Sequence, residues 1–282
     1  MKLTTLLAHT GLLCVAFAAS PSFTEPLGHE WIAPTSKDSR SSCPGLNSMA
    51  NHGWLPHSGK NIDLAALQHA VKGAFNFAPD ALDETFQAAV DFKLTTTGNS
   101  STINLGDLDL HDAIEFDGSI SRNDFFLGDN THFDPVVWAS TANRLGLHDS
   151  VETEADKFVT IEKAAVARAL RVQDAMRANP RFNASAAQQQ RSPGTTGLYL
   201  AALWNETAGA APKTWVMSFF EQEHIPYLLG FDPQARAEQS SQDIAAVVSS
   251  ILQVNVMLGG FPISKSERSG SDSRNLHGFR WF

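Results

Sequence analysis

Residues 41–47 read Ser41-Ser42-Cys43-Pro44-Gly45-Leu46-Asn47, and their cysteine–proline pair is the most informative feature of the chain. Proline suits the first position of a helix, because its missing N–H needs no partner there. A helix that begins at Pro44 places the Cys43 sulfur beside unpaired backbone N–H groups, which favour a thiolate. A permanent thiolate attracts a cation, and a haem iron is one candidate. A free buried cysteine is the alternative for this stretch taken alone.

The N-terminus has the features of a secretory signal peptide. Lys2 precedes an apolar run that extends to Ala18, and Ala16-Phe17-Ala18 fits a cleavage site. The run is shorter than the ~20 residues that a membrane-spanning helix needs. We therefore expect residues 1–20 to be removed and residues 21–282 to form a secreted protein. Of the two cysteines, Cys14 lies in the signal, so the mature chain keeps only Cys43 and can form no internal disulfide.

Composition narrows the class of protein. The formal net charge is −9, and the loss of Lys2 makes it −10, which argues against a nucleic-acid partner. Eighteen phenylalanines and six tryptophans suffice for a core and an apolar pocket. No later segment is apolar enough to span a membrane. Sequons at Asn99, Asn183 and Asn205 fit a secreted glycoprotein.

The pattern of apolar residues predicts a mostly α-helical single domain. Helical spacing recurs in four ranges, which are 61–77, 80–93, 151–178 and 241–258. We expect Asn61 to cap the first helix, the third to stop before Pro180 and the fourth to end at Gly259-Gly260. A short helix after Cys43 should end at Gly53, and residues 20–42 should form an extended arm. Residues 214–219 fit a strand or a helix equally well.

A dense group of carboxylates occupies residues 107–119. Glu115 and Ser119 are spaced i and i+4, so their oxygens could share a hard cation such as Mg²⁺ or Ca²⁺. The spacing does not fit an EF-hand, and a solvated acidic loop is the preferred interpretation of this segment taken alone. Asp124, Asp129 and Asp134 are interpreted as surface charges and helix caps.

Residues 219–227 contain His224, which could be catalytic. No nucleophile is placed beside it, so a helix end that meets Pro226 is the preferred interpretation. Motifs typical of α/β-hydrolases, nucleotide-binding enzymes and zinc proteases do not occur in the sequence.

Taken together, three segments resemble the haem-thiolate peroxidase family, which contains chloroperoxidase and the fungal unspecific peroxygenases. They follow the family's order from residue 43 to about residue 230. The first is quite specific, and the other two would be weak if found singly. The residues that carry the resemblance are Cys43-Pro44-Gly45-Leu46-Asn47 with Asn51-His52-Gly53, Leu55-Pro56 and Gly59-Lys60, then Glu115-Phe116-Asp117-Gly118-Ser119-Ile120-Ser121-Arg122, then Phe219-Phe220-Glu221-Gln222-Glu223 with Pro226-Tyr227.

The resemblance implies a helical domain that encloses haem b, with Cys43 as the proximal iron ligand. It also implies a structural Mg²⁺ held by Glu115, Ser119, the backbone carbonyl of Phe116 and a haem propionate. The implied reaction uses hydrogen peroxide to oxidise or oxygenate a small organic substrate. A thiolate ligand promotes this reaction because it favours cleavage of the O–O bond.

Two residues depart from the family's pattern at the catalytic positions. Phe116 stands where the short branch has a histidine that supports a distal glutamate. The glutamate itself should fall in residues 192–199, which hold no carboxylate, and Thr195 takes its position. A threonine orients peroxide but is a poor acid–base at neutral pH, and a positioned acid–base contributes ~10²–10⁴-fold. Glu206 and Glu221 are the nearest alternative carboxylates.

These observations support one main hypothesis and two alternatives. The main hypothesis is a secreted haem-thiolate peroxidase or peroxygenase with an atypical distal site, which acts on one organic substrate in a biosynthetic pathway. The first alternative is a haem-binding member without peroxide turnover, acting as a non-redox catalyst or a binding protein. The second is a haem-free helical protein whose Cys43 links two chains.

Overall fold

The structure is a computed structural model that describes residues 22–183 and 186–257. The expected signal peptide at residues 1–20 and the expected helix end at Gly259-Gly260 lie outside these ranges. Helices dominate the described part of the chain, and its only sheets there are two pairs of two-residue strands. The expectation of a mostly α-helical domain is therefore confirmed.

The described helices vary from two turns to five. They are α1 (Pro44–Asn51), α2 (Leu64–Phe75), α3 (Asp83–Asp91), α4 (Pro135–Leu145), α5 (Ile161–Ala178), α6 (Ala186–Ala202), α7 (Lys213–Gln222) and α8 (Ser241–Met257). The strands are β1 (Ile62–Asp63) with β2 (Thr102–Ile103), and β3 (Phe158–Val159) with β4 (Ala211–Pro212), both pairs antiparallel. No described helix combines the length and the apolar run needed to cross a membrane.

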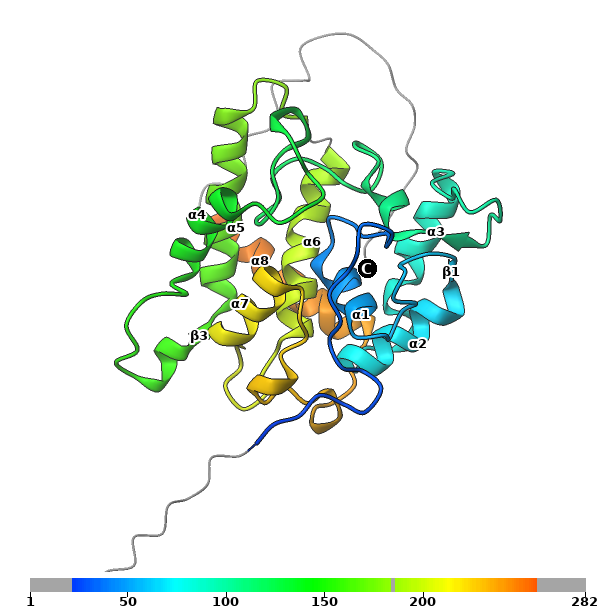
Figure 1. Cartoon of the computed structure of the whole chain (residues 1–282). Coiled ribbons are helices and arrows are strands. Elements are labelled where there is room, and N and C mark those ends of the chain that lie inside the picture. Colours follow the sequence, from blue (N-terminus) through cyan, green and yellow to red (C-terminus); the bar gives the residue numbers. More distant parts are fainter. Residues whose placement is uncertain (1–21, 184–185, 258–282) are drawn as a thin grey trace, which may run out of the picture.

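The helices form two groups on either side of α1 and α6. Figure 1 shows α4 and α5 on one side of the molecule and α2 and α3 on the other. Helix α8 packs against both α5 and α6, and α4 packs against α5. The contact between α6 and α8 is close at Gly197, where a Cβ atom would lie 2.4 Å from the Val248 side chain. The apolar interior between the two groups holds the cavity described below.

The helix boundaries differ from the expected ones where a local cap or strand intervenes. Asp63, not Asn61, caps α2, because its side chain accepts the Ala66 N–H at 2.8 Å while Ile62–Asp63 pair with the second strand. The turn Pro79–Leu82 precedes α3. Helix α5 begins only at Ile161, since Glu154–Val159 form a 3₁₀ turn and a strand, and it stops before Pro180 as expected.

Two helices were not expected, and one ambiguous segment proves helical. Residues 214–219 lie within α7. Helix α4 starts after Asp134, whose side chain accepts the N–H groups of Val136 and Val137, so the expected capping role of Asp134 is confirmed. Helix α6 contains Pro193, a residue that disfavours a helix interior. Packing against α5 and α8 overrides that preference.

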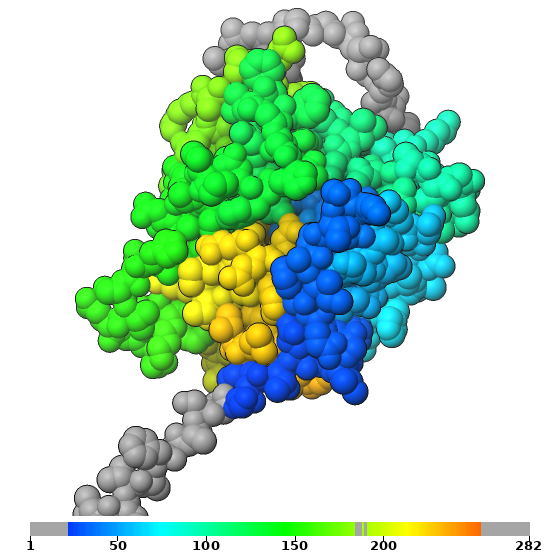
Figure 2. Space-filling view, viewed as in Figure 1, coloured from blue at the N-terminus to red at the C-terminus, as the bar shows by residue number. Residues whose placement is uncertain are grey.

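The N-terminal arm is extended, as expected. In Figure 2 its blue chain crosses the surface between the yellow segment that includes α7 and the cyan segment that includes α2. The Trp31 Nε1–H donates to the Glu223 carbonyl at 3.3 Å, and the Ile32 N–H donates to the Asn51 carbonyl at 2.9 Å. These bonds connect the arm to the end of α7 and to α1.

Candidate functional site

Cys43 is the N-cap residue of α1, and Pro44 is the first residue of that helix, as the sequence predicts. The helix ends at Asn51 and the chain turns at Gly53, whose φ is +68°. The Cys43 side chain lies at the wall of an internal cavity of about 300 Å³. It is accessible from this cavity although it lies deep in the protein. This placement differs from that of a surface thiol linking two chains.

Two opposing effects act on the Cys43 thiol. Burial raises its pKa, whereas the backbone N–H groups of Leu46 and Gly45 and the charge of Arg122 lower it. Burial is the larger effect in the protein without a bound cation. The N–H groups stabilise negative charge on the sulfur, so they favour a cation that binds the sulfur as thiolate.

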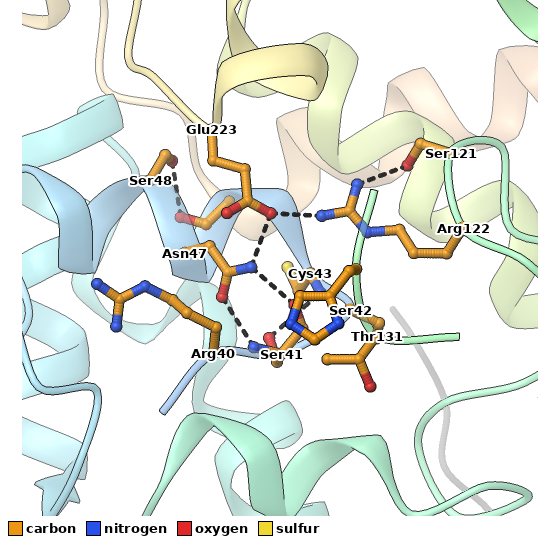
Figure 3. Close-up of polar contacts among 12 residues, drawn as sticks. Arg40, Ser41, Ser42, Cys43, Asn47, Ser48, Ser121, Arg122, Thr131 and Glu223 are labelled. Carbon is orange, nitrogen blue, oxygen red and sulfur yellow. Dashed lines mark hydrogen bonds and ion pairs between the residues drawn. The ribbon is translucent and has the colours of Figure 1, made fainter. Parts of the chain in front are cut away.

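A hydrogen-bonded group behind Cys43 holds its loop in place (Figure 3). The Asn47 side chain accepts the Ser41 N–H at 2.9 Å and donates to the Ser41 carbonyl at 2.7 Å. It also donates to Glu223 Oε1 at 2.8 Å. Glu223 in turn pairs with Arg122, whose guanidinium also donates to Ser121 Oγ at 2.9 Å. Asn47 therefore couples the cysteine loop to a buried ion pair.

The Arg122 side chain is fully buried, and Glu223 is its carboxylate partner. Burial lowers the pKa of Arg122, and the negative charge of Glu223 opposes this effect. Glu223 adopts a left-handed conformation, φ +49°, at the end of α7, which is uncommon for a residue other than glycine. The conformation directs its carboxylate toward Arg122 and Asn47 (Figure 3).

A second part of the cavity wall comes from α5 and α6. Thr195 lines it, and its hydroxyl donates to the Ser192 carbonyl at 2.9 Å. Arg191 lines the same wall and donates from Nη1 to the Ala113 carbonyl at 3.2 Å. Arg168, on α5, donates to Ser192 Oγ at 2.6 Å. This wall thus presents hydroxyls and guanidinium groups to the cavity.

A third part of the wall is formed by Glu115, Phe116 and Ser119. Glu115 Oε2 is hydrogen-bonded to His111 Nδ1 at 2.7 Å. Burial raises the pKa of Glu115, and the bond from His111 opposes this shift. Ser119 Oγ accepts the Arg122 N–H at 3.1 Å. Phe116 brings a side chain without an ionisable group.

Glu115 is the one carboxylate among the described residues that line the cavity. Glu206 and Glu221 are exposed and lie elsewhere: Glu206 accepts the Ala237 N–H at 2.9 Å, and Glu221 accepts the Trp138 Nε1–H at 2.7 Å. The two alternatives considered for a distal carboxylate therefore do not border the cavity.

The interpretation of residues 107–119 as a solvated acidic loop is wrong for its second half. Glu115 and Asp117 are buried, and Asp124, expected at the surface, is fully buried. Asn179 donates to both Asp117 and Asp124, at 3.0 and 3.1 Å, and Arg171 pairs with Asp124 at 3.0 Å. These buried bonds fix the loop against α5. Asp112 and Asp129 are exposed, as expected of surface charges.

His224 follows the end of α7 and does not line the cavity, in agreement with the interpretation as a helix end. It lies with His52 and Glu25 in a cluster whose ligand atoms are within 4.8 Å of one another. His52 Nδ1 is bonded to the His29 carbonyl and Nε2 accepts the Ile225 N–H, so both ring nitrogens already have partners. The cluster is therefore explained as a structural contact between the arm, α1 and the segment after α7.

A comparison with known protein families matches the same segments that form the cavity. The profile of the family described as "Peroxidase, family 2" matches residues 29–238 of this chain. The chain belongs to the haem-thiolate peroxidase family. The match covers the cysteine loop, the buried acidic loop, α6 and the Glu223 segment, so all walls of the cavity fall inside it.

Three relatives illustrate the range of the similarity. The chain is 27% identical over 177 residues to an aromatic peroxygenase of Coprinellus radians (58% of this chain, 66% of the relative). It is 35% identical over 122 residues to a chloroperoxidase of Leptoxyphium fumago (39% and 33%). It is 46% identical over 63 residues to the dothistromin biosynthesis peroxidase dotB of Dothistroma septosporum (22% and 15%). The matched regions thus span less than two thirds of each relative.

The chain's own residues fit the cofactor that the family implies. Cys43 offers its sulfur to a largely apolar cavity, beside N–H groups that stabilise a thiolate. The proposed Mg²⁺ ligands supply oxygens, which suit a hard cation, and Glu115 and Ser119 border the same cavity. His111 occupies Glu115 Oε2, so an ion would use Oε1 or displace the histidine.

Sequence reasoning did not single out Arg168 and Arg191, which line the cavity. A signal for Arg168 was present in the pattern of α5. It lies on the face made by Ala164, Ala165 and Val172, all buried, where a charged residue is unusual. His111 was seen only as a member of the acidic cluster. Its bond with Glu115 depends on the fold of the loop.

Proposed function

We propose that this protein is a secreted haem-thiolate oxidoreductase that uses hydrogen peroxide to oxidise or oxygenate a small organic substrate. One observation carries the proposal: the Cys43 sulfur, at the N-terminus of α1, and Thr195, on α6, line the same cavity. Membership of the haem-thiolate peroxidase family supports it. The aromatic peroxygenase, chloroperoxidase and biosynthetic peroxidase among its relatives support the reaction class and a biosynthetic role.

Each residue has a defined part in this proposal. Cys43 would hold the haem iron, and the N–H groups of Leu46 and Gly45 would stabilise the thiolate. When bound, the haem would supply the redox chemistry that cleaves the O–O bond of peroxide. Glu115, Ser119 and the carbonyl of Phe116 would hold Mg²⁺ at the edge of the site.

The residues of this site give little support to proton transfer to or from peroxide. Thr195 can donate or accept a hydrogen bond and so orient peroxide, but it does not exchange a proton readily at neutral pH. The Phe116 side chain contributes apolar surface and has no group that transfers a proton. Glu115 is engaged by His111. We therefore expect slower peroxide activation than in a site with a positioned carboxylate.

The spectrum of the reduced protein with carbon monoxide tests the proposal. A Soret band at the position typical of thiolate-ligated haem is expected, together with its loss in Cys43→Ala. Met49→Leu, a change of similar size at the same cavity wall, should keep the band. A haem-free protein, or an unchanged band in Cys43→Ala, would refute the assignment.

A second candidate is a haem protein of this family without peroxide turnover. The absence of a carboxylate among the described residues of α6 that line the cavity favours it. Stopped-flow mixing with peroxide separates the two candidates. Rapid spectral change followed by oxidation of an aromatic substrate supports the enzyme, and an inert spectrum supports the second candidate.

A further inference from the structure

The cavity wall formed by α5 and α6 carries two guanidinium groups. Arg168 is buried and bonded to Ser192 Oγ at 2.6 Å. Arg191 is half-buried and lies one helical turn before Thr195, so both side chains reach the cavity from the same face of α6. Burial lowers the pKa of Arg168 to about 10 and also lowers that of Arg191. Both groups remain charged at neutral pH.

Arg191 differs from the buried arginines around it. Arg122 pairs with Glu223 and Arg171 pairs with Asp124. Within residues 22–183 and 186–257, Arg191 forms no ion pair with a carboxylate, and its Nη1 donates to the neutral Ala113 carbonyl. A half-buried charge without an opposite charge is costly, so an anion that enters the cavity would be favoured beside it.

The carboxylate of the remaining described wall does not pair with Arg191. Glu115 is the single described carboxylate at the cavity, and it is bonded to His111. The chain as a whole has a net charge of −9. Positive charge at this wall is therefore a local feature. It lies beside the Ser192 hydroxyl, which accepts an Arg168 N–H and can itself donate to an anion, whereas the hydroxyls of Thr195 and Thr196 donate to the Ser192 carbonyl.

Away from this wall the cavity is mostly apolar. Its other lining residues include Leu67, Val71, Phe75, Phe86, Leu105 and Ile114. A ligand that matches both parts has an apolar skeleton and one negatively charged end. A carboxylate suits the planar fork of a guanidinium, because it can accept two parallel hydrogen bonds.

We propose that the substrate of this enzyme is an apolar organic acid whose carboxylate binds Arg191, beside Arg168 and the Ser192 hydroxyl of α6. The inference rests on the proposed function and specifies its substrate class. It also gives a reason for a threonine at position 195, where the family resemblance leads us to expect a glutamate. A glutamate there would stand one turn from Arg191 and would compete with the substrate for its charge.

Binding to the haem-loaded full-length protein tests this inference. The probes are 4-phenylbutyrate and its neutral counterpart 4-phenylbutanol, measured by calorimetry and by the shift of the Soret band. We expect the acid to bind about tenfold tighter than the alcohol, as charge-assisted hydrogen bonds predict. Arg191→Met should remove this preference without changing the affinity for the alcohol, and Arg191→Lys should keep part of it.

Arg181→Met is the matched control, because it removes a guanidinium that lies over the ring of Phe126 outside the cavity. It should keep the preference for the acid. Equal binding of acid and alcohol, or an unchanged preference in Arg191→Met, overturns the inference. So does loss of haem in Arg191→Met, since Arg191 would then hold a haem propionate. An intact thiolate spectrum with equal binding refutes the substrate class alone, whereas absence of haem refutes the proposed function as well.

Discussion

Asn47 and Glu223 are joined by a 2.8 Å hydrogen bond although 176 positions separate them in the sequence. Glu223 also pairs with Arg122 (Figure 3). These three residues come from the three segments that carry the family resemblance, and they meet directly behind the Cys43 loop. The three segments, far apart in the sequence, therefore meet in one hydrogen-bonded group. Its hydrogen bonds and ion pair position the cysteine loop.

Replacing Glu223 by glutamine should destabilise the protein. The variant leaves Arg122 buried without an opposite charge. Because Glu223 is partly exposed, we expect the free energy of unfolding to fall by roughly 2–3 kcal/mol. Chemical denaturation measures the loss. Glu221→Gln, which alters an exposed side chain bonded to Trp138, should lose less than about 1 kcal/mol. Equal losses in the two variants would contradict a central role for the buried pair.

Thr195→Glu should increase the rate of reaction with peroxide. The change places a carboxylate on the α6 wall of the cavity, where it can transfer a proton, and we expect an increase of up to about 10²-fold. Stopped-flow spectroscopy measures this rate. Thr195→Gln has the same shape without the ionisable group and should give no increase. Similar rates in both variants would show that Thr195 does not face the bound peroxide.

Stability should fall below neutral pH because of His52. This residue is fully buried, and burial lowers its pKa to about 4. The imidazole takes up a proton near pH 6.5 in the unfolded chain. Between pH 6.5 and about 4 the folded state therefore binds fewer protons than the unfolded state. The stabilisation is present in full above pH 6.5 and is lost as the pH falls to 4, by up to about 3 kcal/mol.

Denaturation of wild type and His52→Gln at pH 7, 5.5 and 4.5 checks this prediction. The variant should be less stable at pH 7, because it loses the bonds to the His29 carbonyl and the Ile225 N–H, but its stability should depend less on pH. His132→Gln removes an exposed histidine and should keep the wild-type slope. An unchanged slope in His52→Gln would assign the pH dependence to other groups.

Removal of Mg²⁺ should lower the melting temperature of the haem-loaded protein. The expected ligands Glu115 and Ser119 belong to the loop that borders the cavity, so the ion would connect this loop to the cofactor. Thermal unfolding with and without EDTA measures the effect. Glu115→Gln should be insensitive to the chelator. If wild type is also insensitive, the His111–Glu115 bond stands in place of the ion.

Features that depend on neighbouring residues were predicted well. Pro44 at the start of a helix, Asp134 as a cap and the end of α5 before Pro180 all follow from local backbone rules. The missed helix α6 contains Pro193 and two glycines, so its local preferences point away from a helix. It forms because α5 and α8 pack against it.

The sequence also did not predict that the acidic loop is buried, because its partners lie far along the chain. Asp124 looks like a surface residue in the sequence, since carboxylates are seldom buried. Its partners Arg171 and Asn179 lie 47 and 55 positions further along the chain. Only when α5 is placed against the loop do these groups satisfy the carboxylate.

The sequence by itself determined the cysteine at a helix N-terminus, the helical class and the family resemblance, because each depends on a short run of adjacent residues or on helical spacing. The tertiary structure alone decided which groups share the cavity with Cys43. Arg191 and Thr195 reach it from α6 and Glu115 from the acidic loop, while Glu206 and Glu221 do not border it. Long-range packing sets these positions, and no local preference of the chain encodes them.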